Sequence, residues 1–213
     1  MKSIGELKDI YSGYDIYVVA SGASAGFIDP SFFNNKLAIG VNEVWKRFAN
    51  MDYVVRKESK WMSAAIAASR QFGFKLIVSQ HNCGTLKYEK NTGADYYFEH
   101  LDNGLQDIDL SVVGTDKIVV SYSTITSAIH VAAYMGAANI ILVGHDCGTL
   151  DGNTNIAGYA EALHGAQFYR EFLKVIEPQT VALRDKLKEV YSCNVYSLNP
   201  FVNFGLEGHE YVR

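Results

Sequence analysis

Long apolar runs are absent from this sequence. No segment approaches the ~18 consecutive apolar residues that a membrane-spanning helix needs. The first residues, MKSIGELKDIYSGYDIYVVASG, also lack an uninterrupted apolar region followed by a cleavage site. We therefore expect no membrane span, no secretion and a cytoplasmic location.

Cysteine is scarce. The three cysteines, Cys83, Cys147 and Cys193, lie far apart and form no CxxC pair. This spacing argues against a disulfide framework and against a structural zinc site, and it fits a reducing compartment. The scattered His81 and His100 do not have the spacing of metal ligands either.

An excess of positive charge is also missing. The chain has 19 Lys and Arg against 23 Asp and Glu, which gives a formal net charge of −4. A chain-wide electrostatic footprint for DNA or for an anionic membrane is therefore not expected, and we predict no nucleic-acid partner.

What the chain does have is a repeated order of apolar strand, small-residue turn and helix. The pattern predicts strands at 15–20, 36–41, 52–55, 75–78, 96–100, 118–120, 140–143 and 194–198. It predicts helices at 3–12, 28–33, 44–48, 61–72, 128–135, 160–173 and 180–191, with Pro178 ending the sixth of them. We predict one α/β domain over residues 1–213: a single Rossmann-like, doubly wound, mostly parallel sheet with helices on both faces. The irregular segment at about 79–117 is a candidate substrate-facing insertion.

Polar residues follow several of the predicted strands. They are the small-residue turn 21–26, the pair Asn42-Glu43, the hydroxyl-rich turn 121–127 and the run Gly144-His145-Asp146. Because ligands of open α/β sheets bind beyond the carboxyl ends of the strands, these residues are expected to share one ligand site. Plain strand-to-helix turns and helix caps would leave the same residue types in these places. The turn 21–26 has neither a full GxGxxG pattern nor GK[ST].

A charged run, RKESK, follows the third predicted strand. Arg56 or Lys57 could contact a phosphate there. A solvated loop explains the run more simply, and the sequence favours that interpretation.

Three segments, in this order, resemble motifs of a known family: VVASGAS, AIGVNEVW and TSAIHVAAYMGAANIILVGHDCG. They resemble the MptE-like 6-hydroxymethylpterin diphosphokinase family and the related bacterial lipooligosaccharide sialyltransferases, over roughly residues 15 to 150. Two positions depart from the family pattern. Ala23 stands where proline is usual, and only Glu58 could represent the acid that often follows the third strand.

The resemblance implies a nucleotide site whose residues can be named one by one. The turn after the first strand would lie against the nucleotide phosphates, Asn42 would contact the nucleotide or its leaving phosphate, and a hydroxyl turn and an acid would lie nearby. The predicted nucleotide-binding residues are Ser21, Gly22, Ala23, Ser24, Asn42, Glu43, Thr126, Ser127, Gly144 and Asp146.

The resemblance leaves two mechanisms open, and the role of Asp146 differs between them. In a diphosphokinase, Asp146 would hold a magnesium ion that bridges phosphates, with Asp151 as a second candidate ligand. In a sialyltransferase-like enzyme, Asp146 would line the pocket of the nucleotide-linked donor, and no metal would be required.

A sialyltransferase-like mechanism also needs a general base and a donor to the leaving phosphate. His164 is the best match to the base by its interval from the loop, and Tyr159 matches the phosphate-stabilising hydroxyl. His145, beside Asp146, competes for the role of base, because any imidazole with a pKa near 6.5 can accept a proton at cellular pH. A purely structural histidine is the alternative at position 164.

The leading prediction is therefore a nucleotide-dependent transferase, most specifically a glycosyltransferase that uses a CMP-sialic-acid-like donor and an unknown acceptor. An ATP- and magnesium-dependent pyrophosphokinase is the first alternative, and a non-catalytic nucleotide-binding or assembly protein is the second. Assembly into a homo-oligomer is compatible with each of these.

Overall fold

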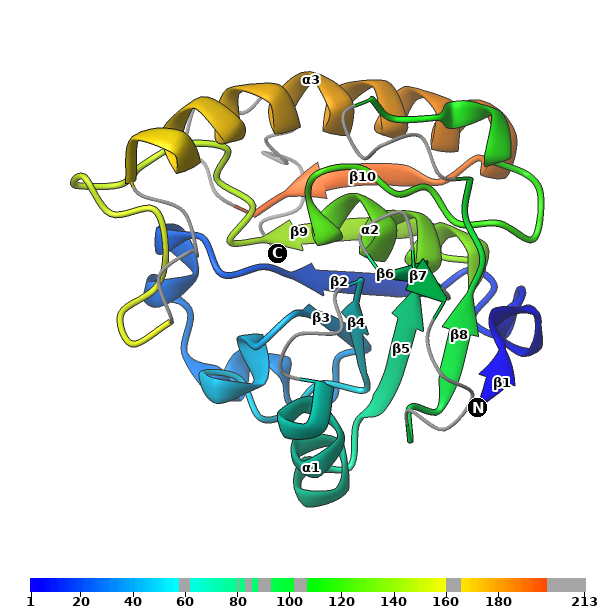
Figure 1. Ribbon diagram of the computed structural model, residues 1–213, viewed down its shortest axis with the longest axis horizontal. Coiled ribbons are helices and arrows are strands. Elements are labelled where there is room, and N and C mark those ends of the chain that lie inside the picture. The colour runs from blue at the N-terminus through cyan, green and yellow to red at the C-terminus, as the bar shows by residue number, and fades with distance from the viewer. Residues whose placement is uncertain are drawn as a thin grey trace.

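A parallel β-sheet forms the centre of the molecule. The structure is a computed structural model, and it describes residues 1–57, 62–79, 81–82, 86–87, 93–101, 107–159 and 166–198. The strands of the sheet are β1 (Lys2–Ser3), β2 (Asp15–Val19), β3 (Ala38–Val41), β4 (Tyr53–Arg56), β5 (Lys75–Ser79), β8 (Tyr96–Phe98), β9 (Asn139–Val143) and β10 (Asn194–Ser197). They lie in the order β1-β8-β5-β4-β3-β2-β9-β10, and every neighbouring pair is parallel (Figure 1). Two further short strands, β6 (His81–Asn82) and β7 (Leu86–Lys87), form a separate antiparallel pair.

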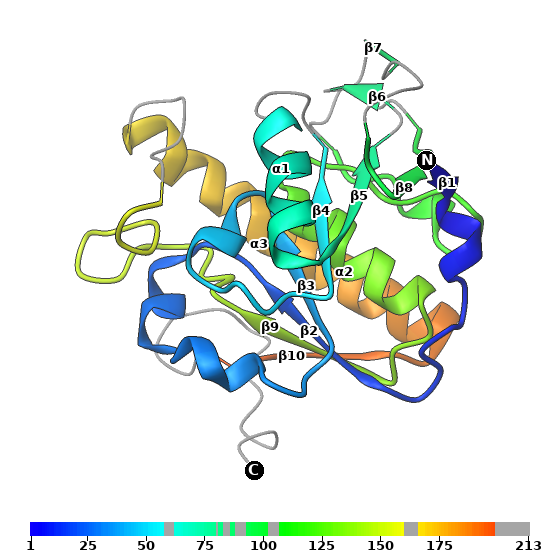
Figure 2. The same ribbon diagram turned by 90° about the horizontal axis from the view of Figure 1, so that it is seen from below.

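Helices cover both faces of this sheet. Helices α2 (Thr124–Tyr134) and α3 (Ala166–Tyr191) lie on one face, and α1 (Met62–Phe72) lies on the other (Figures 1 and 2). Short 3₁₀ helices complete the layers: η1 (Ile4–Leu7), η2 (Ala23–Phe27), η3 (Pro30–Phe33), η4 (Val44–Lys46) and η5 (Leu110–Val112). The predicted doubly wound α/β architecture is confirmed.

The central strands β3, β4, β5 and β9 are buried on both faces, as their continuous apolar runs indicate. Successive side chains of a strand point to opposite faces, so Val18 packs in the cluster beneath α2 while Val19 packs in the cluster beneath α1. Leu142 and Val143 divide between the same two clusters. Two apolar layers therefore hold the sheet from either side.

Helix α2 is buried along its whole length, and it begins four residues before the predicted start at 128. Ser123 has extended backbone angles and precedes the first helical residue, Thr124. The hydroxyl of Thr126 donates to the Ser123 carbonyl at 2.8 Å. Part of the predicted hydroxyl-rich turn is therefore the first turn of a core helix.

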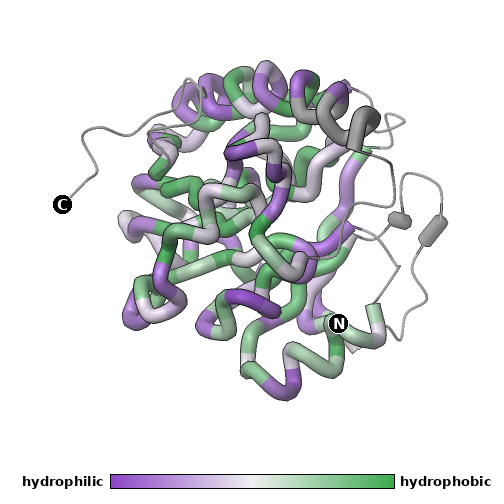
Figure 3. The backbone as a smooth tube through the Cα atoms, turned by 90° about the vertical axis from the view of Figure 1, so that its left-hand side faces the viewer, coloured by the Kyte–Doolittle hydropathy of each residue, from purple (hydrophilic) through white to green (hydrophobic). Residues whose placement is uncertain are grey.

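Pro178 does not break the last helix, so the prediction of two separate helices is wrong. α3 is continuous from Ala166 to Tyr191 with Pro178 inside it. Pro178 and Lys174, whose carbonyl loses its hydrogen bond, are both exposed, so water can satisfy that carbonyl. Leu183 and Leu187 on the opposite side of α3 are fully buried, as the alternation of hydrophilic and hydrophobic turns in Figure 3 reflects.

Several short predicted elements differ in the structure. The helices predicted at 3–12, 28–33 and 44–48 are single 3₁₀ turns, at Ile4–Leu7, Pro30–Phe33 and Val44–Lys46. The predicted strand 118–120 is buried but forms no ladder; only its neighbour Lys117 makes an isolated bridge, to Glu99. Side chains of α2 form hydrogen bonds with this backbone in place of a neighbouring strand. His130 accepts from the Val119 N–H, and the Ser127 hydroxyl donates to the Val119 carbonyl.

The chain reverses its direction of travel across the sheet at β2. Strand β3 pairs with one edge of β2, and β9, much later in the sequence, pairs with the other. The carboxyl ends of these strands form the topological switch point, where open α/β sheets bind ligands. The turns that follow β2, β3, β4 and β9 therefore lie at one edge of the sheet.

Candidate functional site

The turns after β2 and β9 are joined directly to each other. The Gly22 N–H donates to the Gly144 carbonyl at 2.8 Å, and the Ala20 N–H donates to the Val143 carbonyl at the same distance. A Cβ atom on Gly22 would lie 2.3 Å from the Gly144 carbonyl oxygen. Gly144 has φ +66°, and a Cβ there would lie 2.6 Å from the Ala20 carbonyl oxygen. Both positions require glycine because the two backbones approach so closely.

Asp146 holds the turn after β2 in place. Its side chain is 4% exposed, and its Oδ2 accepts from the Ser24 N–H at 2.8 Å. Its Oδ1 accepts from the Ser24 hydroxyl. Both carboxylate oxygens thus anchor the start of η2, and a charge-assisted contact of this kind is strong. The structure places the predicted residues Gly22, Ser24, Gly144 and Asp146 in one contiguous unit.

The strand end of β3 adds Asn42 and Glu43 to the same edge. Asn42 has φ +54°, a left-handed conformation that asparagine tolerates better than most residues. Its N–H donates to the Val55 carbonyl at 3.1 Å. The Glu43 carboxylate forms an ion pair with Lys46 at 3.1 Å.

Tyr159 reaches this edge from the loop that follows β9. The Ile156 N–H donates to the Ser21 carbonyl at 2.9 Å, and the Ser21 hydroxyl donates to Asn155 Oδ1 at 3.1 Å. Burial raises the pKa of the Tyr159 phenol, while hydrogen bonds from the Ser21 side chain and the Glu43 backbone, and then the positive charge of Arg56, act to lower it. The phenol is therefore protonated at neutral pH and can donate a hydrogen bond.

Arg56 and Lys57 do not form a solvated loop, so that interpretation of the charged run is wrong for these two residues. Arg56 is the last residue of β4 and is 3% exposed, with its guanidinium carbon 5.8 Å from the centre of the Trp45 ring. Lys57 is 2% exposed, and its ammonium donates to the carbonyls of Ser121 and Tyr122, the latter at 2.8 Å. In the sequence, the two cations come directly after the apolar residues of this strand, with no turn residue between them. That arrangement is the sequence signal that could have predicted their burial.

The hydroxyls of Thr126 and Ser127 are bonded within the protein. Thr126 Oγ1 lies 2.9 Å from the Ser121 hydroxyl and donates to the Ser123 carbonyl, and Ser127 donates to the Val119 carbonyl. Both residues are fully buried. Any contact of this segment with a ligand is therefore expected from the first N–H groups of α2, which carry the positive end of the helix dipole.

His145 packs between β9 and α3. Its Nε2 lies 2.9 Å from the Thr180 hydroxyl and 3.6 Å from the Cys147 sulfur. Burial lowers the pKa of the imidazole to about 4 and raises the pKa of the Cys147 thiol. At neutral pH His145 is thus a neutral side chain, and Cys147 is a thiol, which is a poor nucleophile.

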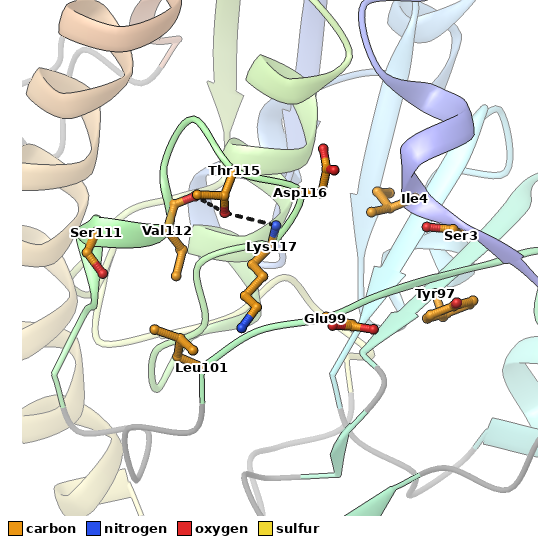
Figure 4. A pocket seen from close by; sticks show the side chains of 10 residues that line it. All are labelled: Ser3, Ile4, Tyr97, Glu99, Leu101, Ser111, Val112, Thr115, Asp116 and Lys117. Carbon is orange, nitrogen blue, oxygen red and sulfur yellow. Dashed lines mark hydrogen bonds between the residues drawn. The ribbon is translucent and has the colours of Figure 1, made fainter.

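A cleft lies at the β1–β8 side of the sheet, away from these residues. It is a cleft of about 430 Å³, shown in Figure 4, whose lining residues are Ser3, Ile4, Tyr97, Glu99, Leu101, Ser111, Val112, Thr115, Asp116 and Lys117. Most of them belong to the segment 79–117, for which a substrate-facing role stays a prediction. Strand β5 lies between β8 and β4, so the cleft and Arg56 belong to different parts of the sheet.

Comparisons with known proteins identify the fold of this chain. No family model and no curated protein matches the sequence. A solved structure does match: the sialyltransferase CstII from Campylobacter jejuni, in complex with the substrate analogue cytidine-5′-monophosphate. The fold of this chain is similar to the fold of that sialyltransferase. The match has a TM-score of 0.51 at 12% sequence identity and covers 90% of this chain and 82% of the other.

This fold agrees with the sialyltransferase side of the resemblance in the sequence, and the MptE-like assignment stays a prediction. His164, the predicted base, lies outside the described residues, as does Glu58. Asp151, the second candidate for magnesium, is exposed in the turn 150–153. Among the described residues no group of three or more His, Cys, Asp or Glu is placed to hold a metal ion. Within the same part of the chain, no helix is long and apolar enough to cross a membrane.

Proposed function

We propose that the protein is a glycosyltransferase that uses a nucleotide-activated sugar, with a CMP-linked sugar as the donor class. The observation that carries this proposal is a group of buried and half-buried hydrogen-bond donors at the switch point of the sheet. These donors lie at the carboxyl ends of neighbouring strands. They are Arg56, Lys57, Ser21, Tyr159 and the start of α2. The fold shared with a sialyltransferase solved with CMP supports the same donor class.

In this proposal the nucleotide phosphate lies at the edge formed by the turns after β2, β3 and β4. The acceptor hydroxyl attacks the anomeric carbon of the sugar, the bond from that carbon to the phosphate oxygen breaks, and the CMP leaves with the bonding electron pair. Tyr159, protonated at neutral pH, donates a hydrogen bond to the leaving phosphate. The proton of the acceptor passes to a general base.

His164 remains the proposed base. His145 is the weaker candidate because burial lowers its pKa to about 4, and a base works best when its pKa is near the operating pH. Its contact with Thr180 on α3 instead supports the loop that carries Asp146. Asp146 orients the turn 21–24 through Ser24, a role that requires no metal.

The alternative, a magnesium-dependent pyrophosphokinase, requires Asp146 to change its hydrogen bonds. As a magnesium ligand it would have to exchange at least one of its Ser24 contacts for the metal. The geometry therefore favours the glycosyltransferase over the pyrophosphokinase. A non-catalytic nucleotide-binding protein would bind the same nucleotides without turnover.

Calorimetry tests this proposal with CMP, UMP, GMP, AMP and ATP, each in EDTA and each in magnesium. We expect CMP to bind tightest, with equal affinity in both buffers, and CMP-linked sugars to be hydrolysed or transferred. Tyr159→Phe should lower kcat by about 10- to 100-fold and change CMP affinity much less, because the hydrogen bond strengthens as charge develops on the phosphate.

Tyr14→Phe is the matched control, since Tyr14 is exposed at the opposite, amino-terminal end of β2, and it should leave kcat unchanged. Binding of ATP only with magnesium, and no binding of CMP, would overturn the proposal. CMP binding without turnover of any CMP-linked sugar would point to the non-catalytic alternative.

A further inference from the structure

A cleft of about 680 Å³ lies at the amino-terminal ends of β2, β3 and β4. Residues of three loops, 11–14, 33–37 and 50–52, line it. Strand β3 has four residues, so about 13 Å of sheet separates this cleft from the turns at the carboxyl ends of the strands. The volume is typical of a site for a small molecule, and the position makes the cleft distinct from the proposed nucleotide edge.

The three loops are bonded to one another and to the sheet. The Asn50 side-chain amide donates to Asn34 Oδ1, and Asp52 Oδ2 accepts from the first N–H of β3 at 2.8 Å. The hydroxyls of Tyr11 and Tyr53 are hydrogen-bonded at 3.0 Å. The walls of the cleft are therefore fixed before a ligand arrives, and a preformed site loses less conformational entropy when it binds.

Two tyrosine rings give the cleft an aromatic wall. Tyr14 is 61% exposed, and its ring packs edge-to-face against the ring of Tyr11, with 5.9 Å between the ring centres. Tyr11 is itself half-buried and is held by Tyr53. An exposed ring that a neighbouring ring holds in place can stack on an apolar face of a ligand and remove that face from water.

Amide, hydroxyl and carboxylate groups line the same cleft. Within the part of the chain that the structure describes, neither the Asn35 amide nor the Tyr14 hydroxyl makes a side-chain hydrogen bond. Asn34 and Asn50 use one polar atom each in their mutual bond, whereas an amide offers a carbonyl acceptor and two N–H donors. The cleft thus presents both donors and acceptors beside its aromatic wall.

The cleft carries little net charge. The charged residues that line it are Asp52 and Lys36, one of each sign. The Lys36 ammonium lies 4.4 Å from the centre of the Phe32 ring and 5.8 Å from that of the Tyr17 ring, so aromatic faces already stabilise it. Because the cleft has no surplus of either charge, it favours a neutral ligand over a phosphate or a cation.

We propose that this cleft is a non-catalytic binding site for a neutral pyranose sugar. A pyranose has an apolar C–H face, which stacks on the Tyr14 ring, and a rim of hydroxyl groups that both donate and accept. The hydroxyl groups hydrogen-bond with the side chains of Asn35, Asn50 and Asp52. The inference stands apart from the proposed function, because all of these residues lie at the opposite end of the strands from the nucleotide edge.

Titration of the ¹⁵N-labelled full chain, followed by its amide NMR signals, tests this site. The probes are methyl α-D-glucopyranoside, methyl β-D-galactopyranoside and methyl N-acetyl-β-D-glucosaminide. At least one of them should shift the signals of the loops 11–14, 33–37 and 50–52 and leave those of Gly22 and Gly144 in place. Sorbitol, which has the hydroxyl groups without a ring, should shift none of them.

Tyr14→Ala should weaken the binding of that glycoside by about 10-fold, because the stacking surface is lost, and Tyr14→Phe should retain most of the affinity. Asn35→Gly removes the amide and keeps the left-handed backbone at φ +63°, so it should weaken binding by about 3- to 10-fold. Phe72→Ala removes an exposed aromatic ring from α1, outside the cleft, and should leave the affinity unchanged.

The proposal is overturned if none of the three glycosides shifts these signals, or if sorbitol shifts them as strongly. It is also overturned if Tyr14→Ala, shown to be folded by its spectrum, binds the glycoside as tightly as the unaltered protein. A dimer in sedimentation that Tyr14→Ala dissociates would make the cleft an interface between two copies of the chain instead. Failure of CMP to bind would refute the proposed function and leave these expectations unchanged, so failure of the two proposals is distinguishable.

Discussion

At the residue scale, the contact between Ser24 and Asp146 decides how the predicted phosphate turn is built. The two residues are 122 positions apart in the chain, yet both carboxylate oxygens of Asp146 accept from Ser24. The contact is buried, and breaking one side of a buried charged hydrogen bond leaves a group without its partner. The residues therefore act as a unit in holding the turn 21–24.

Replacing Asp146 by Asn should lower the free energy of unfolding by about 1–3 kcal/mol, because the amide cannot accept both bonds from Ser24. Ser24→Ala should have an effect of similar size, and the double variant should lose much less than the sum of the two. Denaturant unfolding of the four proteins measures this.

Asp151→Asn is the matched control, since Asp151 is exposed and asparagine also accepts its left-handed backbone conformation. It should change the free energy of unfolding by less than about 0.5 kcal/mol. Additive losses for the Ser24 and Asp146 variants would contradict the coupling. Magnesium that stabilised the unaltered protein but not Asp146→Asn would instead support a metal role for Asp146.

At the scale of elements, α3 shows how packing overrides a local breaker. Pro178 is exposed, and the helix continues through it because the buried side of α3, with Ile176 and Leu183, packs on the sheet and α2. The Thr180 hydroxyl donates to the Ile176 carbonyl at 3.0 Å, one turn earlier. A helix of 26 residues then keeps Thr180 beside His145.

Pro178→Ala should therefore raise the free energy of unfolding by about 1–2 kcal/mol. The alanine restores the missing N–H donor to the Lys174 carbonyl, and the extra freedom of the unfolded chain cancels part of the gain. Thermal and denaturant unfolding measure the change, with Asp185→Ala on the exposed side of α3 as the control. A loss of stability in Pro178→Ala would mean that the proline ring itself contributes to the packing of α3.

At the scale of the whole molecule, the sheet determines which residues share an environment. Its order places β9 and β3 on either side of β2, so Asn42 and Asp146 lie at the same edge although more than a hundred residues separate them. The fold also buries His130 and His145 almost completely. His130 accepts from the Val119 N–H and lies 3.3 Å from the Tyr191 hydroxyl, and His145 lies against Thr180 and Cys147.

These two histidines should make the fold less stable in mild acid. Burial lowers the pKa of His130 to about 3 and that of His145 to about 4, whereas a histidine of the unfolded chain titrates near 6.5. The unfolded state therefore binds more protons as the pH falls below 6.5. The stability that is complete above this pH is lost progressively, down to about pH 4 for His145 and about pH 3 for His130.

Between pH 7 and pH 5 each histidine should account for about 2 kcal/mol of the loss in the free energy of unfolding. Denaturant unfolding at several pH values measures the slope, and His145→Asn should reduce the slope by about one proton. An equal slope in His145→Asn and the unaltered protein would show that this imidazole is not buried in its neutral form.

The sequence by itself determined the class of fold and most of the strands. The continuous apolar runs at β2, β3, β4, β5 and β9 predict strands buried on both faces, because only a parallel sheet covered on both sides needs such runs. The sequence also marked the turns after β2, β3 and β9 as one site, since the carboxyl ends of parallel strands meet at one edge. Local patterns decide these features.

Only the tertiary structure decided what the individual side chains do. The sequence favoured a solvated run at Arg56 and Lys57, because charge pattern alone does not reveal that Trp45 packs against Arg56 and that the segment before α2 accepts hydrogen bonds from Lys57. The continuity of α3 through Pro178, and the use of Asp146 to hold Ser24, also depend on residues far away in the chain. The physical reason is the same in each case: burial and hydrogen-bond partners come from distant segments, and no local pattern contains them.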